Sequence, residues 1–259
     1  MKNKFVVIIP ARINSTRIKK KMILSVGEYP LIIQTAIQSK KSSAQNVVVA
    51  TDDEEIFNLC YQYNINAIMT DVNHKSGTDR VVEASIKLNL DDNDTIINVQ
   101  GDEPLVNYNL INDLAEFFVE KKTNFATVAG LIENVEDVFN PNIVKVVLDK
   151  DDNALYFSRS PIPFYRDGYV DKLNSKMPRF NVLKHIGIYA YNLKYLKIFK
   201  NSPQSEIEQV ESLEQLRALY NGEKIAVLKN NSFYHHGVDT YDDLERVQKI
   251  LLEKNHEFN

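Results

Sequence analysis

The sequence predicts an α/β protein built on a doubly wound, mostly parallel sheet. Over the first 120 residues, short apolar runs typical of strands buried on both faces alternate with helical patterns. Such alternation is typical of parallel strands joined by right-handed crossovers. Beyond residue 124 the predicted strands follow one another more closely, which indicates a smaller β-rich excursion from the main sheet. A chain of 259 residues has room for one large domain.

In the first half, each element is predicted from its own pattern. Residues 5–9 are five consecutive apolar residues, and Pro10 is expected to end this strand because proline has no N–H to donate. Pro30 can open a helix at its first position. The other elements expected here are strands at 47–50, 67–69 and 95–99, a helix over 56–63 and a helix from residue 79.

In the second half, strands are expected at 125–132, 143–148, 154–158, 186–191 and 225–228, and residues 149–153 form a hairpin turn. An amphipathic helix is predicted from Ile207, Val210, Leu213, Leu216 and Tyr220. Residues 235–240 are expected to end a strand. A C-terminal helix follows, with Leu244, Val247, Ile250 and Leu251 on its buried side.

Residues 158–178 differ from the rest of the chain. They contain three prolines and a glycine and show little periodicity. We interpret them as an extended excursion from the core and as a possible dimer contact.

Composition narrows the classes of function. The net charge of −4 and the pI near 5.8 argue against broad nucleic-acid binding. A single cysteine, Cys60, excludes an internal disulfide framework and suits a reducing cytoplasm. No stretch approaches the roughly 20 apolar residues of a membrane helix, so no membrane insertion is expected. The N-terminal apolar run is also too short for the core of a signal peptide.

A basic loop follows the first predicted strand. It carries five cations in ten positions: Arg12, Arg17, Lys19, Lys20 and Lys21. Open α/β sheets bind ligands at the carboxyl ends of their strands. Arginine forks pair with phosphate oxygens and lysine acts as a point charge, so the loop suits a polyphosphate. The alternative is a solvated basic turn.

Two aspartates, Asp102 and Asp239, follow apolar segments and have a glycine nearby, Gly101 and Gly237, that lets the backbone crowd a ligand. Two carboxylates at strand ends can hold Mg²⁺ beside a nucleotide phosphate. The alternatives are a helix cap for Asp239 and a turn for Asp102.

Residues 76–80, Ser-Gly-Thr-Asp-Arg, begin a predicted helix and could direct backbone N–H groups and a guanidinium at a nucleotide. The alternative is an ordinary capped helix start with Arg80 in solvent. His235 and His236 do not predict a metal site, because neighbouring strand side chains face opposite ways and no third ligand has zinc spacing. The chain has neither the glycine-rich dinucleotide fingerprint nor a P-loop.

Taken together, the motifs resemble the 3-deoxy-manno-octulosonate cytidylyltransferase (CMP-Kdo synthetase) family nearly end to end. The resemblance is carried by Ile-Pro-Ala-Arg-x-x-Ser-Thr-Arg at 9–17, Val-Ala-Thr-Asp-Asp at 49–53, His-x-Ser-Gly-Thr-Asp-Arg at 74–80, Asn-Val-Gln-Gly-Asp-Glu-Pro at 98–104, Val-Lys-Val-Val at 144–147, Ala-Leu-Tyr-Phe-Ser-Arg-Ser-Pro-Ile-Pro at 154–163, Lys-His-Ile-Gly-Ile-Tyr-Ala-Tyr at 184–191, Glu-Ser-Leu-Glu-Gln-Leu-Arg at 211–217 and Gly-Val-Asp-Thr at 237–240. Each motif is weak alone, but nine in the family's order are specific.

The resemblance implies a fold of the nucleotide-diphospho-sugar transferase type and a Mg²⁺-dependent transfer of CMP from CTP to Kdo, for lipopolysaccharide or capsule. It implies one domain over 1–259, with a CTP-binding core at 1–124, a sugar-binding and dimerisation part at 125–200 and a part returning to the core at 201–259. A cytoplasmic homodimer is expected.

The resemblance also implies the residues of the site. The implied triphosphate ligands are Arg12, Arg17 and Lys21, and the implied cytidine contacts are Ser76, Gly77, Thr78, Arg80 and Gln100. The implied metal ligands are Asp102 and Asp239, and the implied sugar contacts are Arg159, His185, Tyr189, Glu214 and Gln215. Arg12, Lys21 and the two aspartates would form the catalytic set.

The basic loop departs from the family pattern in one place. Where the family usually has Leu-Pro-Gly-Lys-Pro-Leu, residues 18–23 read Ile-Lys-Lys-Lys-Met-Ile, which keeps the lysine at Lys21 and removes a preset turn. Three functions therefore stay open: activation of Kdo, the same chemistry on 8-amino-Kdo or another acidic sugar, and CTP binding without catalysis.

Overall fold

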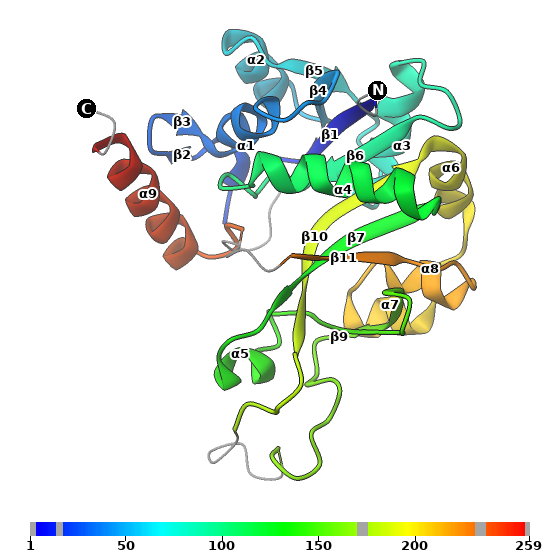
Figure 1. Cartoon of the computed structure of the whole chain (residues 1–259). Helices are drawn as coiled ribbons and strands as arrows, with labels where there is room; N and C mark the ends of the chain where they lie inside the picture. Colours follow the sequence, from blue (N-terminus) through cyan, green and yellow to red (C-terminus); the bar gives the residue numbers. More distant parts are fainter. Residues whose placement is uncertain (1–3, 14–17, 170–175, 231–236, 257–259) are drawn as a thin grey trace.

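A mixed nine-stranded sheet forms the centre of the computed structural model, which describes residues 4–13, 18–169, 176–230 and 237–256 (Figure 1). Its main path runs β11-β7-β10-β6-β1-β4-β5, and β8 and β9 extend it from β10. The strands are β1 (Phe5–Ala11), β4 (Asn46–Thr51), β5 (Asn66–Met69), β6 (Thr95–Val99), β7 (Phe125–Leu131), β8 (Lys145–Leu148), β9 (Ala154–Ser158), β10 (Leu183–Asn192) and β11 (Ala226–Asn230). The predicted fold class is confirmed.

Along the main path of the sheet, β10 runs opposite to the other strands. Strands β5, β4, β1 and β6 pair in parallel, and so do β7 and β11. Strand β10 lies antiparallel between β6 and β7. The hairpin predicted at 149–153 is confirmed, because β8 and β9 pair antiparallel and the Asp149 N–H donates to the Asn153 carbonyl.

The predicted end of the first strand was wrong by two residues. Strand β1 continues through Pro10 to Ala11, in register with β4. Its pairing with β6 stops at Ile8. Beyond that point β1 has a strand neighbour on one side only, so a residue without an N–H is tolerated as it is on an edge strand.

Helices cover both faces of the sheet and give three layers. One face carries α1 (Leu31–Lys40), α2 (Glu54–Gln62) and α4 (Tyr108–Lys121), and the other carries α3 (Gly77–Lys87), α6 (Leu193–Asn201), α7 (Glu206–Glu211) and α8 (Leu216–Tyr220). The chain ends in α9 (Tyr241–His256), which packs beside the small hairpin β2 (Ser25–Val26) and β3 (Tyr29–Pro30) (Figure 1). Helix α1 begins at Leu31, one residue later than predicted.

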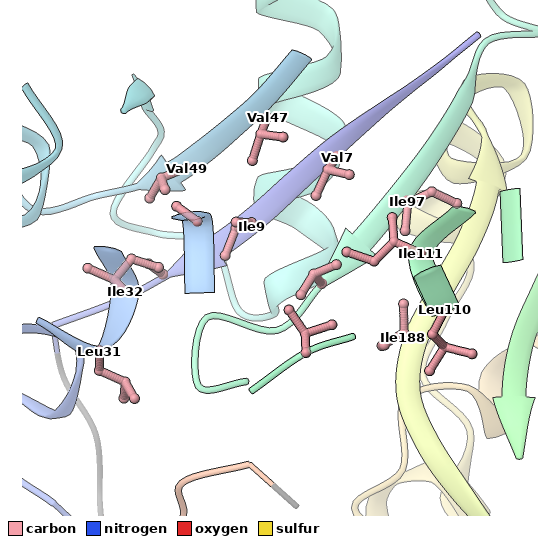
Figure 2. Packing of buried hydrophobic residues seen from close by; sticks show 14 of the residues in the cluster. Val7, Ile9, Leu31, Ile32, Val47, Val49, Ile97, Leu110, Ile111 and Ile188 are labelled. Carbon is pink, nitrogen blue, oxygen red and sulfur yellow. The ribbon is translucent and has the colours of Figure 1, made fainter. Parts of the chain in front are cut away.

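The core follows from the alternation of side chains along the strands. Val7 and Ile9 of β1 join the cluster under α1 and α4, together with Ile32 and Ile111 (Figure 2). Val6 and Ile8 of the same strand join the opposite cluster. A fully buried side chain of this size stabilises the fold by about 1.5–3 kcal/mol. Both faces of β1 are therefore buried, as its unbroken apolar run predicts.

Two predicted elements near the C-terminus were wrong. The amphipathic helix over 207–220 is divided into α7 and α8, because Ser212 adopts a left-handed φ of 52° and caps the end of α7. Val210 and Tyr220, predicted on the apolar stripe, are exposed. In place of a strand end, residues 237–239 form a loop; His235 and His236 lie outside the described residues.

The excursion predicted at 158–178 extends below the sheet with α5 (Val135–Phe139) (Figure 1). Strand β9 ends at Ser158, and the other described residues of the excursion, 159–169 and 176–178, contain no helix or strand. They pack around a separate small apolar cluster that includes Val138, Ile143 and Tyr169. Across the ranges that the structure describes, no helix is long and apolar enough to cross a bilayer.

Candidate active site

A cavity of about 270 Å³ lies at the carboxyl ends of β1 and β6. Its wall includes eight residues predicted from the sequence: Arg12, Lys21, Ser76, Gly77, Arg80, Gln100, Asp102 and Asp239. They come from four segments that are far apart in the chain, and the parallel pairing of β1 with β6 brings the first and third of these segments together. The predicted triphosphate ligand Arg17 lies outside the described residues.

Lys21 links the two predicted metal ligands. Its ammonium lies 2.7 Å from Asp102 Oδ2, 2.7 Å from the Val238 carbonyl and 3.4 Å from Asp239 Oδ1. The side chain is 7% exposed. Because the Lys21 ammonium is shielded from solvent, its attraction to the two carboxylates is strong and holds them near a single point. Of the three consecutive lysines, only Lys21 lines the cavity.

The backbone before Lys21 forms a turn in a conformation that favours glycine. Lys20 has a left-handed φ of 54° and precedes the short 3₁₀ helix Lys21–Ile23. Its side chain points away from Lys21 to the exposed carboxylate of Glu55. Lys20 therefore puts a side chain at a position where the backbone favours glycine.

We expect Lys20→Gly to raise Tm by about 2 °C, because glycine adopts the left-handed region without a steric penalty. The surface pair with Glu55 contributes little, so Glu55→Gln should leave Tm within about 1 °C. Differential scanning calorimetry of both variants measures this. A lower Tm for Lys20→Gly, with Glu55→Gln unchanged, would contradict the backbone explanation.

The two glycines beside the aspartates permit close contact between protein segments. A Cβ on Gly101 would lie 2.9 Å from the Pro10 carbonyl oxygen, and one on Gly237 would lie 2.9 Å from the Asp102 carbonyl oxygen. That same Asp102 carbonyl accepts a 2.9 Å hydrogen bond from the Val238 N–H. The two glycines therefore let the segments around the site pack closely, and the close approach of a ligand stays a prediction.

The donor set fits a Mg²⁺ ion that shares its ligands with a substrate. The carboxylates of Asp102 and Asp239 both contact the Lys21 ammonium, so they converge on one point. Within the described ranges, no group of three or more His, Cys, Asp or Glu side chains could hold a metal. Magnesium is usually held by one or two carboxylates together with substrate phosphates and water, so two carboxylates here are sufficient.

The start of α3 forms another wall of the cavity. Ser76 caps the helix in a reciprocal capping box with Asp79. Arg80 is 4% exposed, and its guanidinium bonds to the Asp52 carboxylate and to Thr70. The alternative of a solvated Arg80 is therefore wrong, and much of its hydrogen-bonding capacity is used by the protein.

Thr78, by contrast, points from α3 toward the predicted sugar residues. Its hydroxyl donates a 2.8 Å hydrogen bond to Glu214 Oε2. Burial raises the pKa of Glu214 above its ordinary value. The other carboxylate oxygen, Glu214 Oε1, and the amide nitrogen of Gln215 are buried without a hydrogen-bond partner in the described structure. Such atoms are costly unless a ligand or water satisfies them.

His185 and Tyr189 lie together on β10, with ring centroids 5.4 Å apart. His185 Nε2 is 2.9 Å from the Thr127 hydroxyl, and the ring meets Phe157 edge-on. Burial lowers the pKa of His185 to about 3 and raises that of Tyr189 above its ordinary value. Both side chains are therefore neutral near pH 7 and can act only as hydrogen-bonding groups.

We expect the free energy of unfolding to fall by about 1.4 kcal/mol between pH 7.5 and 5.5 through His185, because the unfolded histidine (pKa near 6.5) takes up a proton that the folded one does not. Urea unfolding at both pH values measures the loss. His185→Gln should show a drop smaller by that amount, since the other histidines contribute equally to both proteins. Equal drops would show that the folded protein does not hold His185 in its neutral form.

Arg159 lies at the end of β9, apart from the first cavity. Its Nε donates to the Glu211 carbonyl at 2.8 Å and its Nη1 to the Pro141 carbonyl at 2.9 Å. The Glu211 carboxylate accepts hydrogen bonds from the Ser158 hydroxyl and the Arg159 N–H. The fold thus joins Arg159 to the turn that carries Glu214, while Lys21 and Asp102 line the cavity at the ends of β1 and β6.

Three further residues near these groups were not predicted as site residues. His74 and Lys75 line the cavity, and Lys145 is fully buried beside Arg159. His74 and Lys75 lie directly before the Ser76 helix start, so their position in the motif was an available signal. The signal for Lys145 was a single charge inside an apolar strand pattern, Val-Lys-Val-Val.

Comparisons with known proteins identify the family of this chain. The family model described as cytidylyltransferase matches residues 6–225. The 3-deoxy-manno-octulosonate cytidylyltransferase of Herminiimonas arsenicoxydans is 44% identical over 249 residues, which cover 96% of this chain and 99% of that protein. The protein of the same name from Neisseria meningitidis serogroup C is 44% identical over 247 residues, 95% and 98% of the two chains.

Among solved structures, CMP:2-keto-3-deoxy-manno-octonic acid synthetase complexed with CTP matches with a TM-score of 0.86 and 34% identity. The match covers 97% of this chain and 99% of that one. A cytidylyltransferase from Leptospira borgpetersenii, at 16% identity and a TM-score of 0.61, shares the fold. The chain thus belongs to the cytidylyltransferase family.

Proposed function

We propose that this protein transfers CMP from CTP to the anomeric hydroxyl of Kdo, giving CMP-Kdo and pyrophosphate. The observation that carries the proposal is the convergence of Lys21, Asp102 and Asp239 in the cavity at the ends of β1 and β6. The relatives that share this chain nearly end to end bear the name of that activity. The product would serve lipopolysaccharide or capsule synthesis.

The proposed nucleotide site uses the cavity wall. Arg12, Arg17 and Lys21 would bind the triphosphate, while Gln100 and the Ser76–Arg80 stretch would contact the cytidine. The hydroxyl oxygen of the sugar forms a bond to the α-phosphorus as the bond to pyrophosphate breaks. Such a transfer depends mainly on positioning and on neutralisation of charge, so no side-chain nucleophile is required.

Asp102 and Asp239 would hold a Mg²⁺ ion at the carboxylate pair. When bound, the ion would supply charge neutralisation and lower the pKa of the attacking hydroxyl. The Lys21 ammonium contacts both aspartates and offsets part of their negative charge. With the nucleotide present, this ammonium is close enough to the cavity to contact phosphate oxygens instead.

The proposed sugar site combines neutral and charged groups. Arg159 would pair with the sugar carboxylate, because its side-chain bonds go to neutral carbonyls and leave its charge available. His185, Tyr189, Glu214 and Gln215 would read the hydroxyl groups. The buried atoms of Glu214 and Gln215 that make no hydrogen bond in the described structure support this role.

The proposal extends to the assembly and its location. Phe164 of the excursion and Phe180 just after it are 63% and 41% exposed. Their rings contact Tyr169 and Tyr165, which contact each other, and exposed aromatic side chains on one such cluster favour a contact with another chain. We propose that a second copy covers them in a homodimer. We place the enzyme in the cytoplasm, where CTP is available and where the lone buried Cys60 stays reduced.

Pyrophosphate release from the purified protein tests the proposed reaction, with each of the four nucleoside triphosphates, Mg²⁺ and Kdo present or omitted. Release that requires CTP, Kdo and Mg²⁺ together is the expected result. Release with CTP and only 8-amino-Kdo or another acidic sugar would keep the reaction and change the substrate. CTP binding without release, for every acidic sugar, would indicate a non-catalytic relative.

A further inference from the structure

Lys145 is a buried ammonium that the proposed mechanism does not use. The residue is fully buried, and its Nζ donates to the carbonyls of Asn140 at 2.9 Å, Ile143 at 2.6 Å and Arg159 at 2.6 Å. These three bonds use all three ammonium donors. None of the described carboxylates forms an ion pair with it.

Lys145 lies on β8, between the strand that carries His185 and the strand that precedes Arg159. Strand β8 pairs with β10 on one side and with β9 on the other. Lys145 lies opposite Ser158, the residue before Arg159. On the other side, the His185 N–H donates to the carbonyl of Val144. One ammonium thus lies at the junction of the Arg159 and His185 strands.

Lys145 also fixes the loop on which the Arg159 guanidinium rests. Asn140 and Ile143, whose carbonyls accept from Lys145, flank Pro141 closely in sequence. The carbonyl of Pro141 accepts from Arg159 Nη1. The ammonium therefore holds both the backbone of Arg159 and the loop that orients its side chain, while Nη2 has no partner among the described residues.

Burying this charge has an energetic cost. Burial, with a smaller contribution from the charge of Arg159, lowers the pKa of Lys145 to about 8. Apolar side chains of similar volume are often as stabilising as buried ionic groups. A lysine that bonds only to carbonyls is thus better explained by the geometry that it imposes than by stability.

We infer that Lys145 is a positioning residue for the acidic sugar, because its three hydrogen bonds fix the backbone of Arg159 and the loop under the Arg159 guanidinium. The inference rests on the proposed function, in which Arg159 receives the sugar carboxylate. It predicts a selective effect, since the residues that line the nucleotide cavity do not contact Lys145.

The test is a steady-state comparison of wild type, Lys145→Met and the control Lys150→Met. Lys150 lies in the turn of the same hairpin with 87% of its side chain exposed. Lys145→Met should raise KM for Kdo by about 10-fold or more while KM for CTP stays within about 2-fold. Lys150→Met should match wild type. Equal changes in both KM values, or none, would overturn the inference.

A double-mutant cycle separates positioning from general damage. If Lys145 acts through the guanidinium, Lys145→Met should change KM for Kdo no further in an Arg159→Ala background. An additional, multiplicative loss would contradict the inference. Lys145→Gln, which keeps one donor group, provides a milder variant in case the methionine protein does not fold, and it should give a smaller rise in the same KM.

Hydrogen exchange gives a readout that needs no substrate. In Lys145→Met the amides of Arg159 and Ser160 should exchange faster than in wild type, while those of α3 should not change. Unchanged exchange at both amides would refute the positioning role. A wild-type protein that does not turn over Kdo would refute the proposed function alone, because this exchange result stands independently of it.

Discussion

Asp102→Asn is expected to lower kcat by at least about 100-fold, because the carboxylate that would hold the metal becomes a neutral amide of the same shape. The fold should persist. The Asp102 carbonyl keeps its bond to Val238, and an asparagine oxygen can still accept from Lys21. The remaining loss, a weaker bond to the ammonium, is about 1–2 kcal/mol of unfolding free energy. Pyrophosphate release and urea unfolding measure the two effects separately.

Asp151→Asn is the matched control for this prediction. It makes the same chemical change at an aspartate with 64% of its side chain exposed, in the hairpin turn, and should leave both measurements unchanged. For Asp102→Asn, the Mg²⁺ concentration that gives half-maximal rate should also rise. A kcat within a few fold of wild type would remove Asp102 from the metal site.

The strands were largely predictable because a strand that is buried on both faces has an unbroken apolar sequence. Strands β6 and β9 begin and end where the pattern predicts. The order of the sheet was not predictable in the same way. Strand β10 pairs antiparallel with β6 and β7, which are far from it in the sequence. The pattern of a single strand does not specify its partner. The break at Ser212 also had no glycine to signal it.

The candidate site was predictable in part, for a related reason. Lys21, predicted from its position in the motif, lines the cavity even though the usual flanking glycine and prolines are replaced. Lys20 adopts a left-handed backbone conformation, which glycine favours. The pairing of Arg80 with Asp52 was not foreseen. It depends on two side chains 28 residues apart meeting at the ends of different elements. Contacts of that kind come from tertiary packing, which a local motif does not encode.

Arg217→Met is expected to reduce the free energy of unfolding by about 3–5 kcal/mol, because it leaves a buried carboxylate without its partner. Arg217 Nε and Nη2 bond to the two oxygens of Glu208 at 2.9 and 2.6 Å, and both residues are 5% exposed. The guanidinium also lies 4.7 Å from the centre of the Phe199 ring. Urea unfolding at pH 7.5 measures the loss.

The partner variant shows whether the loss comes from the missing contact or from the unpaired charge. If the unpaired charge dominates, Glu208→Leu combined with Arg217→Met should be more stable than Arg217→Met alone, since no charge is then left in the interior. Breaking the exposed pair between Lys197 and Asp92 by Lys197→Met should cost less than about 1 kcal/mol. A double variant no more stable than Arg217→Met would show instead that α7 and α8 need this ion pair to stay together. In that case the buried charges specify the turn that presents Glu214 and Gln215 to the proposed sugar site.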